Sequence, residues 1–138
     1  MAVHSGQLRL TTRGHADVVD ITEGVVAVLR TSGVEVGTVV AFVTGSTAAL
    51  TTMEYEPGGV ADLRTLLDEL VPAGRAWEHN ERNHDTNAHA HLRAALIGPS
   101  ESVPVVGGRL VLGTWQQLVL VDFDDRRRER VVTIQVHA

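Results

Sequence analysis

Apolar and polar residues alternate along the segments near both ends of the chain. Residues 7–12 and 130–136 follow the period of two that is typical of half-buried strands. Residues 37–44, 47–54 and 117–123 are richer in valine, alanine and leucine, as buried strands are. These five segments predict a domain dominated by β-structure.

Shorter extended segments complete the expected sheets. Residues 15–21 form a further extended segment after Gly14. Residues 104–106 and 109–112 flank Gly107-Gly108, which predicts a hairpin with a glycine turn. Residues 124–129 are charged, and we expect them to form a solvated turn or a subunit contact through Arg–Asp pairs.

A helical period appears in three places. Residues 60–71 are the clearest case, because four leucines recur on one face and Pro72 ends the segment. Pro57-Gly58-Gly59 before it predicts a turn. Residues 22–30 predict a helix with Asp20 or Thr22 as its N-cap, and residues 88–97 predict a short one.

The count of elements sets the fold class. Seven or eight strands against two or three helices predict an α+β fold that is mainly β. A length of 138 residues corresponds to one domain, which we place over residues 1–138. The chain is 43% hydrophobic and 21% charged, which is typical of a folded globular protein.

Charge and missing residue types exclude several functions. The formal net charge of −5 argues against a nucleic-acid-binding surface. No apolar run reaches the ~20 residues of a membrane span, and no signal peptide is evident, so we expect a cytoplasmic protein. The absence of cysteine excludes thiol nucleophiles and disulfides, and the absence of lysine excludes Schiff-base chemistry.

Histidines concentrate in one polar segment. His79, His84, His89 and His91 all fall between residues 78 and 92. Imidazole and carboxylate are the usual ligands for zinc, iron or manganese where thiolates are missing. His89 and His91 would chelate one ion on an extended backbone, but would diverge by about 200° on a helix. We expect the helix to begin at or after His91; the alternative is that these histidines solvate a loop or cap the helix.

Other polar residues could complete a site. Glu54 ends a strand that is otherwise apolar or hydroxylic, so it could be a general base or a metal ligand, or simply an exposed strand-end residue. Ser46 and Thr47 follow Gly45 and could bind an anion, or belong to a plain hairpin turn. Arg93 or Arg109 could bind phosphate.

The motif Gly113-Thr114-Trp115-Gln116 is distinctive. It is preceded by Ser100, by Val103-Pro104-Val105 and by Gly108. With these residues the chain resembles the YjbQ family, also called UPF0047 or secondary thiamine-phosphate synthase. Further matches are residues 20–22, 32–33, Gly37, 46–50, Glu54, 78–79, Asp85, Asn87, 91–92, Gly98, 122–124, Arg128 and 132–136.

The resemblance implies a compact β-sandwich with flanking helices that assembles as a homotrimer. It also implies a divalent metal, often zinc, held by histidines near the subunit interface. The activity attributed to the family is a weak thiamine-phosphate synthase reaction. In it a pyrimidine pyrophosphate loses pyrophosphate, and the nitrogen of a thiazole phosphate attacks the resulting cation.

Two departures from the family pattern bear on the site. Many members carry histidine where this chain has Gly45, and asparagine where it has Met53. A rebuilt site is therefore expected, in which His84 or His89 supplies the missing imidazole.

The resulting hypothesis is a metal-dependent enzyme acting on a small phosphorylated heterocycle. The alternatives are a non-catalytic trimer that binds a metal or a metabolite, and histidines that are purely structural at a trimer axis. In the enzyme hypothesis Glu54 and Asp85 are catalytic, and His79, His89 and His91 bind the metal. The expected substrate-binding residues are Ser46, Thr47, Asn87, Arg93, Thr114 and Gln116.

Overall fold

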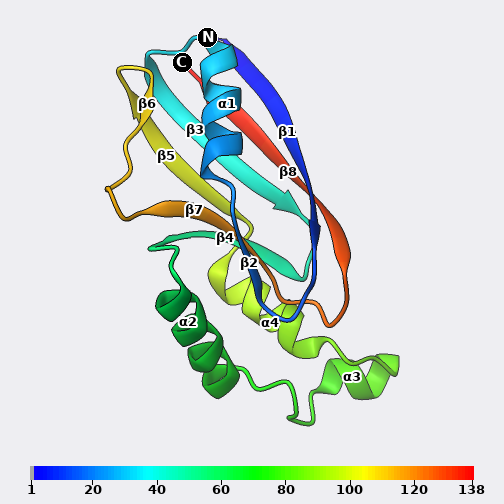
Figure 1. Cartoon of the computed structure of the whole chain (residues 1–138). Coiled ribbons are helices and arrows are strands. Elements are labelled where there is room, and N and C mark those ends of the chain that lie inside the picture. Colours follow the sequence, from blue (N-terminus) through cyan, green and yellow to red (C-terminus); the bar gives the residue numbers. More distant parts are fainter. Residues whose placement is uncertain (1) are drawn as a thin grey trace.

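Two antiparallel sheets form the body of the protein. The computed structural model describes residues 2–138. One sheet has five strands in the order β1-β8-β3-β5-β6, and the other has three in the order β2-β7-β4 (Figure 1). The strands are β1 (Val3–Thr12), β2 (Asp17–Asp20), β3 (Val36–Thr44), β4 (Ala48–Met53), β5 (Ser100–Val106), β6 (Arg109–Leu110), β7 (Gln117–Asp122) and β8 (Arg128–His137).

The segments of β3 and β7 were both expected to be buried strands, but they differ in burial. In β3, Val39 and Ala41 are buried while Thr38 and Phe42 face outward, so the five-stranded sheet covers the core with one face. β7 instead has five consecutive buried residues after Gln117. The three-stranded sheet is therefore covered on both faces, which explains why this segment is a continuous apolar run.

The core lies in two layers on either side of the three-stranded sheet. One layer packs the two sheets against α1 (Thr22–Ser32), through residues such as Val25, Leu29 and Leu50. The other packs the second face against α2 (Pro57–Leu70) and α4 (Ala88–Ile97), through residues such as Leu67 and Ala90. Both α2 and α4 lie at the end of the molecule away from α1 (Figure 1).

The first helix begins at Thr22 as predicted, but its N-cap is Ile21 and not Asp20 or Thr22. The Asp20 carboxylate accepts hydrogen bonds from the backbone N–H and the hydroxyl of Thr22, at 3.0 and 2.7 Å. Gly33 ends the helix in the left-handed region at φ 69°, which glycine adopts without strain.

The second helix begins earlier than the sequence pattern indicates. Pro57-Gly58-Gly59, predicted as a turn, forms its first turn. The Glu56 carboxylate accepts hydrogen bonds from the N–H groups of Gly58 and Gly59, and proline suits a first helical position because it has no N–H to leave unpaired. Capping by Glu56 therefore outweighs the turn propensity of the two glycines.

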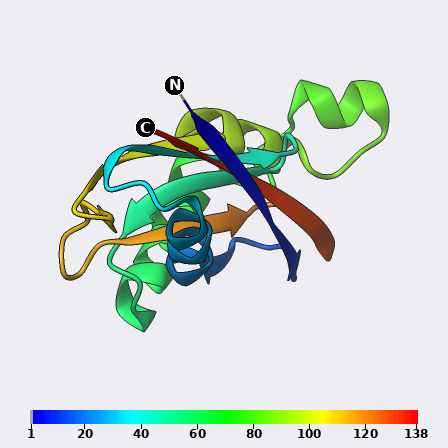
Figure 2. The same ribbon diagram turned by 90° about the horizontal axis from the view of Figure 1, so that it is seen from above.

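The histidine-rich segment contains a helix that was not predicted. α3 (Glu78–Asn83) projects from the body of the protein (Figure 2). α4 then begins at Ala88, so the prediction that it begins at or after His91 is wrong. The amide oxygen of Asn80 accepts a hydrogen bond from the backbone N–H of Ala88 at 3.0 Å, which stabilises this earlier start.

Two further segments differ from expectation. His15 and Ala16 have positive φ angles of 54° and 60°, so the second strand begins only at Asp17. Asp124 and Arg130, expected in or beside a solvated charged turn, are buried. No helix within residues 2–138 is both long and apolar enough to cross a membrane.

Candidate functional site

The residues expected to form one site lie at opposite ends of β4. Ala48 at one end pairs with Asp122, and Met53 at the other pairs with Gln117. The histidines and Ser46 belong to the first end, whereas Glu54 and the 113–116 motif belong to the second. At about 3.3 Å per residue, β4 alone spans roughly 17 Å. A single chain therefore does not bring the two groups together.

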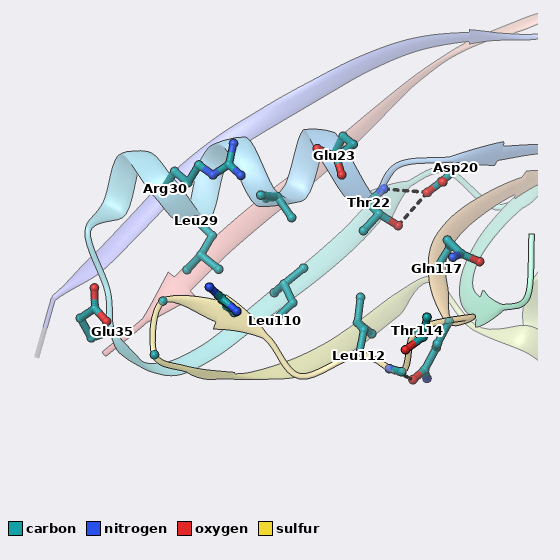
Figure 3. A pocket seen from close by; sticks show the side chains of 16 residues that line it. Asp20, Thr22, Glu23, Leu29, Arg30, Glu35, Leu110, Leu112, Thr114 and Gln117 are labelled. Carbon is teal, nitrogen blue, oxygen red and sulfur yellow. Dashed lines mark hydrogen bonds between the residues drawn. The ribbon is translucent and has the colours of Figure 1, made fainter.

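The 113–116 motif lines a cavity of about 580 Å³ against α1. Figure 3 shows Leu29 of α1, Leu110 and Leu112 around it, with Thr114 on the loop. Carboxylates and guanidinium groups of both signs also line it: Asp20, Glu23, Arg30, Glu35 and Arg109. An apolar wall with mixed charge suits a small amphipathic ligand rather than a polyanion.

Gln116 holds this loop in place. Its Oε1 accepts a hydrogen bond from the backbone N–H of Gly113 at 3.1 Å, and its Nε2 donates to the hydroxyl of Thr52 at 3.0 Å. The amide is therefore engaged within the protein. Trp115 beside it is 72% exposed. Glu54 is also exposed, and the backbone of Tyr55 next to it donates to Gln117 Oε1 at 2.9 Å.

At the other end of β4, His79 and His91 lie together. Their ring centroids are 4.7 Å apart and the rings are tilted by 48°. His79 Nδ1 lies 3.1 Å from Asn80 Oδ1, and the same oxygen accepts from the N–H of Ala88. Because Oδ1 can only accept, His79 donates its Nδ1–H. This tautomer leaves the lone pair on Nε2 available.

A cavity of about 250 Å³ adjoins His91, lined also by Gly45, Ser46 and the Ala94-Ala95 turn of α4. Gly45 has φ 138°, and a Cβ atom there would lie 2.7 Å from Nη1 of Arg130. A histidine at this position would need both a different backbone conformation and a displaced arginine. The structure therefore does not accommodate, at Gly45, the histidine that the family resemblance implies.

His89 lies apart from His91. Because α4 begins at Ala88, the two side chains diverge by about 200°, and they do not form the chelate expected on an extended backbone. His89 lines a separate cavity of about 250 Å³ with His15, Arg64 and Arg93. Burial lowers the pKa of His89, and the nearby charges of Arg93 and His15 lower it further, whereas Asp125 and Asp124 oppose them.

A buried network of charges supports the histidine end of β4. Arg130 donates from Nε and Nη2 to the two oxygens of Asp122, at 2.7 and 2.8 Å, and from Nη2 to the Thr47 hydroxyl at 2.6 Å. Thr12 also donates to Asp122. Sequence reasoning missed Arg130 and Asp122, because a charge-rich turn is normally solvated.

Asp124 extends this network toward α4. Its carboxylate accepts hydrogen bonds from Thr47, Arg128 and Asn87, at 3.0, 2.9 and 3.4 Å. Burial by itself would raise the pKa of Asp124, but these bonds and that from the Asp125 N–H hold it well below its ordinary value. Thr47 and Asn87 were expected to bind substrate. Their side chains are instead buried, and they stabilise the loop between β7 and β8 that contains Asp124.

Asp85 has a local role in the structure. Its carboxylate accepts from the backbone N–H of Thr86 at 2.8 Å, and its own N–H donates to the carbonyl of Asn80 at 3.1 Å. It is exposed in the turn between α3 and α4. Its carboxylate therefore stays open to solvent at the histidine end.

Whether one chain can bind a metal ion depends on how many histidines and carboxylates lie close together. Within residues 2–138 no group of three or more histidines and carboxylates converges on one point. A catalytic zinc ion takes three protein ligands. His79 and His91 supply two imidazoles, so the described residues of one chain hold fewer donors than such a site needs.

Comparisons with known proteins agree on one family. The family model described as UPF0047 protein YjbQ-like matches residues 6–138. A UPF0047 protein of Methanothermobacter thermautotrophicus is 37% identical over 95% of this chain and 90% of its own length. UPF0047 protein YugU of Bacillus subtilis is 34% identical over 87% of this chain and 89% of its own.

Solved structures agree with this result. A YbjQ-like protein of unknown function from Sulfolobus solfataricus superimposes with a TM-score of 0.93 at 38% identity, covering 98% of this chain and 96% of its own. A hypothetical protein from Aeropyrum pernix gives 0.90 at 40% identity, covering 97% and 98%. The chain therefore belongs to the YjbQ (UPF0047) family of uncharacterised proteins.

Proposed function

We propose that this protein is a metal-dependent enzyme that acts on a small phosphorylated heterocycle, with thiamine-phosphate synthesis as a secondary activity. The observation that carries the proposal is the close pair of imidazole rings, His79 and His91, beside an open cavity. Zinc is the first candidate metal, because imidazole nitrogen is among its preferred ligands. A bound divalent cation would neutralise negative charge on a phosphate leaving group.

The surroundings of His79 support a ligand role. Asn80 accepts the Nδ1 proton of His79 and also caps α4, so one side chain fixes both the tautomer and the helix that carries His91. Outer partners of this kind orient metal-bound histidines in many proteins. The pair is thus organised before any ion binds.

Assembly as a homotrimer would supply what one chain lacks. In a cyclic trimer each interface joins two different surfaces of the subunit. The Glu54 end of β4 in one copy can therefore approach the histidine end of the next copy. Leu92 and Leu96 are exposed on α4, the helix that carries His91, and Phe42 is exposed on the outer face of the five-stranded sheet. Such uncovered apolar side chains favour subunit contacts.

The roles of the chain's own residues follow from this arrangement. Glu54, exposed at the end of β4, would move a proton on the bound substrate. Ser46, exposed beside His91, would orient the substrate through its hydroxyl. Thr114 would contact the apolar part of a ligand in the groove under α1. Asp85 would serve as a second acid or base at the histidine end.

One observation favours the non-catalytic alternative. Neither Glu54 nor Asp85 is buried beside the His79–His91 pair, and a carboxylate open to solvent is a weak general base. A trimer that binds a metal or a metabolite without turnover would need neither residue. The two functions make opposite predictions for a variant at Glu54.

The test combines metal content with turnover. Elemental mass spectrometry of the untagged protein should find about one transition metal for each His79–His91 pair. The metal should be lost in His79→Ala and kept in His4→Ala, a control variant on β1. Native mass spectrometry should find three chains. Glu54→Gln should keep the metal and lose turnover of a pyrimidine pyrophosphate with a thiazole phosphate.

Each outcome assigns the function. Metal without turnover of any compound in a screen of thiazole and pyrimidine phosphates would favour the non-catalytic alternative. No metal in the wild-type protein, even after reloading with zinc, iron and manganese, would overturn the proposal.

A further inference from the structure

A second cavity lies on the other side of α4 from the His79–His91 pair. We call it the Arg64 pocket; its volume is about 250 Å³, and its polar lining is His15, Arg64, Asp68, His89 and Arg93. Three separate parts of the chain contribute these side chains, namely the turn after β1, α2 and α4. Three residues of α4 were expected to bind metal or phosphate. His91 lines one cavity, whereas His89 and Arg93 line the other.

Arg93 brings a buried positive charge to this pocket. It is only 4% exposed, and it donates from Nε and Nη2 to the carbonyl of Val71 at 3.2 and 2.9 Å. The carboxylate that binds it, Asp68 at 3.0 Å, is itself 73% exposed to solvent. Because this carboxylate lies in water, its attraction for the buried guanidinium is weak, and an anion in the pocket would add to it.

Arg64 adds a second guanidinium to the same space. Its Nε donates to the backbone carbonyl of Ala16 at 3.0 Å, and within residues 2–138 its two Nη groups form no hydrogen bond. Asp68 is the one carboxylate in the lining, against two arginines. The lining therefore carries an excess of positive charge.

His89 has a buried polar atom that lacks a hydrogen-bond partner among the described residues. His89 is 7% exposed, and its Nδ1 has no hydrogen-bond partner among the described residues. A buried polar atom without a partner costs about 1–3 kcal/mol, and such atoms in native proteins commonly indicate an absent water or ligand.

The turn that carries His15 is strained. Gly14, His15 and Ala16 all have positive φ angles, of 76°, 54° and 60°. Non-glycine residues pay about 1–2 kcal/mol each for this conformation. The turn places His15 at the pocket and turns the Ala16 carbonyl toward Arg64, so the strained backbone builds the pocket wall.

We propose that the Arg64 pocket binds the phosphate group of a small molecule, with Arg64 and Arg93 as the donors and with His15 and His89 completing the lining. Guanidinium groups suit phosphate because they present parallel N–H donors to two oxygens. The volume lies below the usual range for drug-sized ligands, which favours inorganic phosphate or a short phosphate ester. This inference does not depend on a metal at His79 and His91.

The experiment titrates chelator-treated protein with inorganic phosphate, with pyrophosphate and with glycerol phosphate, followed by calorimetry and by ³¹P NMR. Chelator removes any metal that could itself bind phosphate. Saturable binding should weaken about tenfold or more in Arg64→Gln, since one charge-assisted contact is lost. The strongest of the three ligands shows whether free phosphate, pyrophosphate or an ester fits the pocket.

Matched variants control for net charge and for folding. Arg82→Gln removes the same charge from α3, where Arg82 pairs with exposed Glu78, and should bind phosphate as the wild type does. Asparagine tolerates the left-handed backbone at position 15, so His15→Asn should fold normally. This variant should weaken phosphate binding less than Arg64→Gln does. His91→Ala should bind phosphate normally even though the metal proposal requires it to lose metal.

Three results would overturn the inference. They are no saturable phosphate binding by the wild-type protein, equal weakening in Arg82→Gln and Arg64→Gln, and loss of phosphate binding in His91→Ala. The last would place the anion at the His79–His91 cavity instead.

Discussion

His79 and His91 have ring centroids 4.7 Å apart although they lie on different helices, whereas His89, two residues from His91, lines another cavity. Spacing along the chain therefore misleads about which histidines act together. The turn between α3 and α4, fixed by Asn80, decides the pairing. One cluster in the sequence is thus divided between two places in the structure, and we propose different chemistry for each.

The buried pair of Asp122 and Arg130 should be essential for stability. Asp122→Asn leaves the guanidinium buried beside a neutral amide, and we expect a loss of about 3–5 kcal/mol in the free energy of unfolding. Urea titration measures this loss. The exposed pair of Glu78 and Arg82 provides the control, since Glu78→Gln should change stability little. A loss as small as that of the control would contradict the role given to Asp122.

Asp124 should make the protein sensitive to acid. Its folded-state pKa lies below the ordinary 3.8, so the unfolded chain binds the proton first as the pH falls. The stabilisation is present above pH 3.8 and is lost as the pH falls toward the folded-state pKa. Asp124→Asn should be less stable than the wild type at neutral pH. Urea titrations across this range should show that the variant loses less unfolding free energy on acidification than the wild type does. An unchanged acid dependence would argue against the network.

Restoring the histidine of other family members at Gly45 should destabilise this chain. The φ angle of 138° and the Arg130 guanidinium leave no place for the new Cβ atom. We expect Gly45→His to lose about 1–3 kcal/mol of unfolding free energy. Gly74→His is the matched control, because nothing lies within 4 Å of a Cβ atom there. A Gly45→His protein with full stability would show that the loop adapts freely.

Gln116 should keep the 113–116 loop ordered. Gln116→Ala removes the bonds to Gly113 and Thr52, so amide hydrogen exchange in this loop should become faster. Gln135→Ala changes an exposed glutamine on β8 and should leave the loop unchanged. Equal exchange rates in Gln116→Ala and the wild type would mean that other contacts hold the loop.

Much of the fold was predictable because burial and period agree along most of the chain. β8 alternates and has one buried face, whereas β7 is continuously apolar and is covered on both faces. The errors fall where local polar groups override propensity. Glu56 caps two glycines into a helix, and Asn80 moves the start of α4 to Ala88.

The site was less predictable, because its arrangement depends on contacts between distant parts of the chain. Arg130 pairs with Asp122 across a turn that looks solvated in the sequence. Arg64 is held at the pocket by its hydrogen bond to the carbonyl of Ala16. Ala16 belongs to a strained turn that the sequence pattern did not predict. Helical phase shows that His89 and Arg93 share a side of α4, but only once the first residue of that helix is known.

The proposed metal site at His79 and His91 is tested most directly by a calorimetric zinc titration of His91→Ala and His89→Ala beside the wild-type protein. We expect saturable zinc binding that is lost in His91→Ala and retained in His89→Ala, because the two histidines line different cavities. Loss of zinc binding in both variants, or in His89→Ala alone, would contradict it.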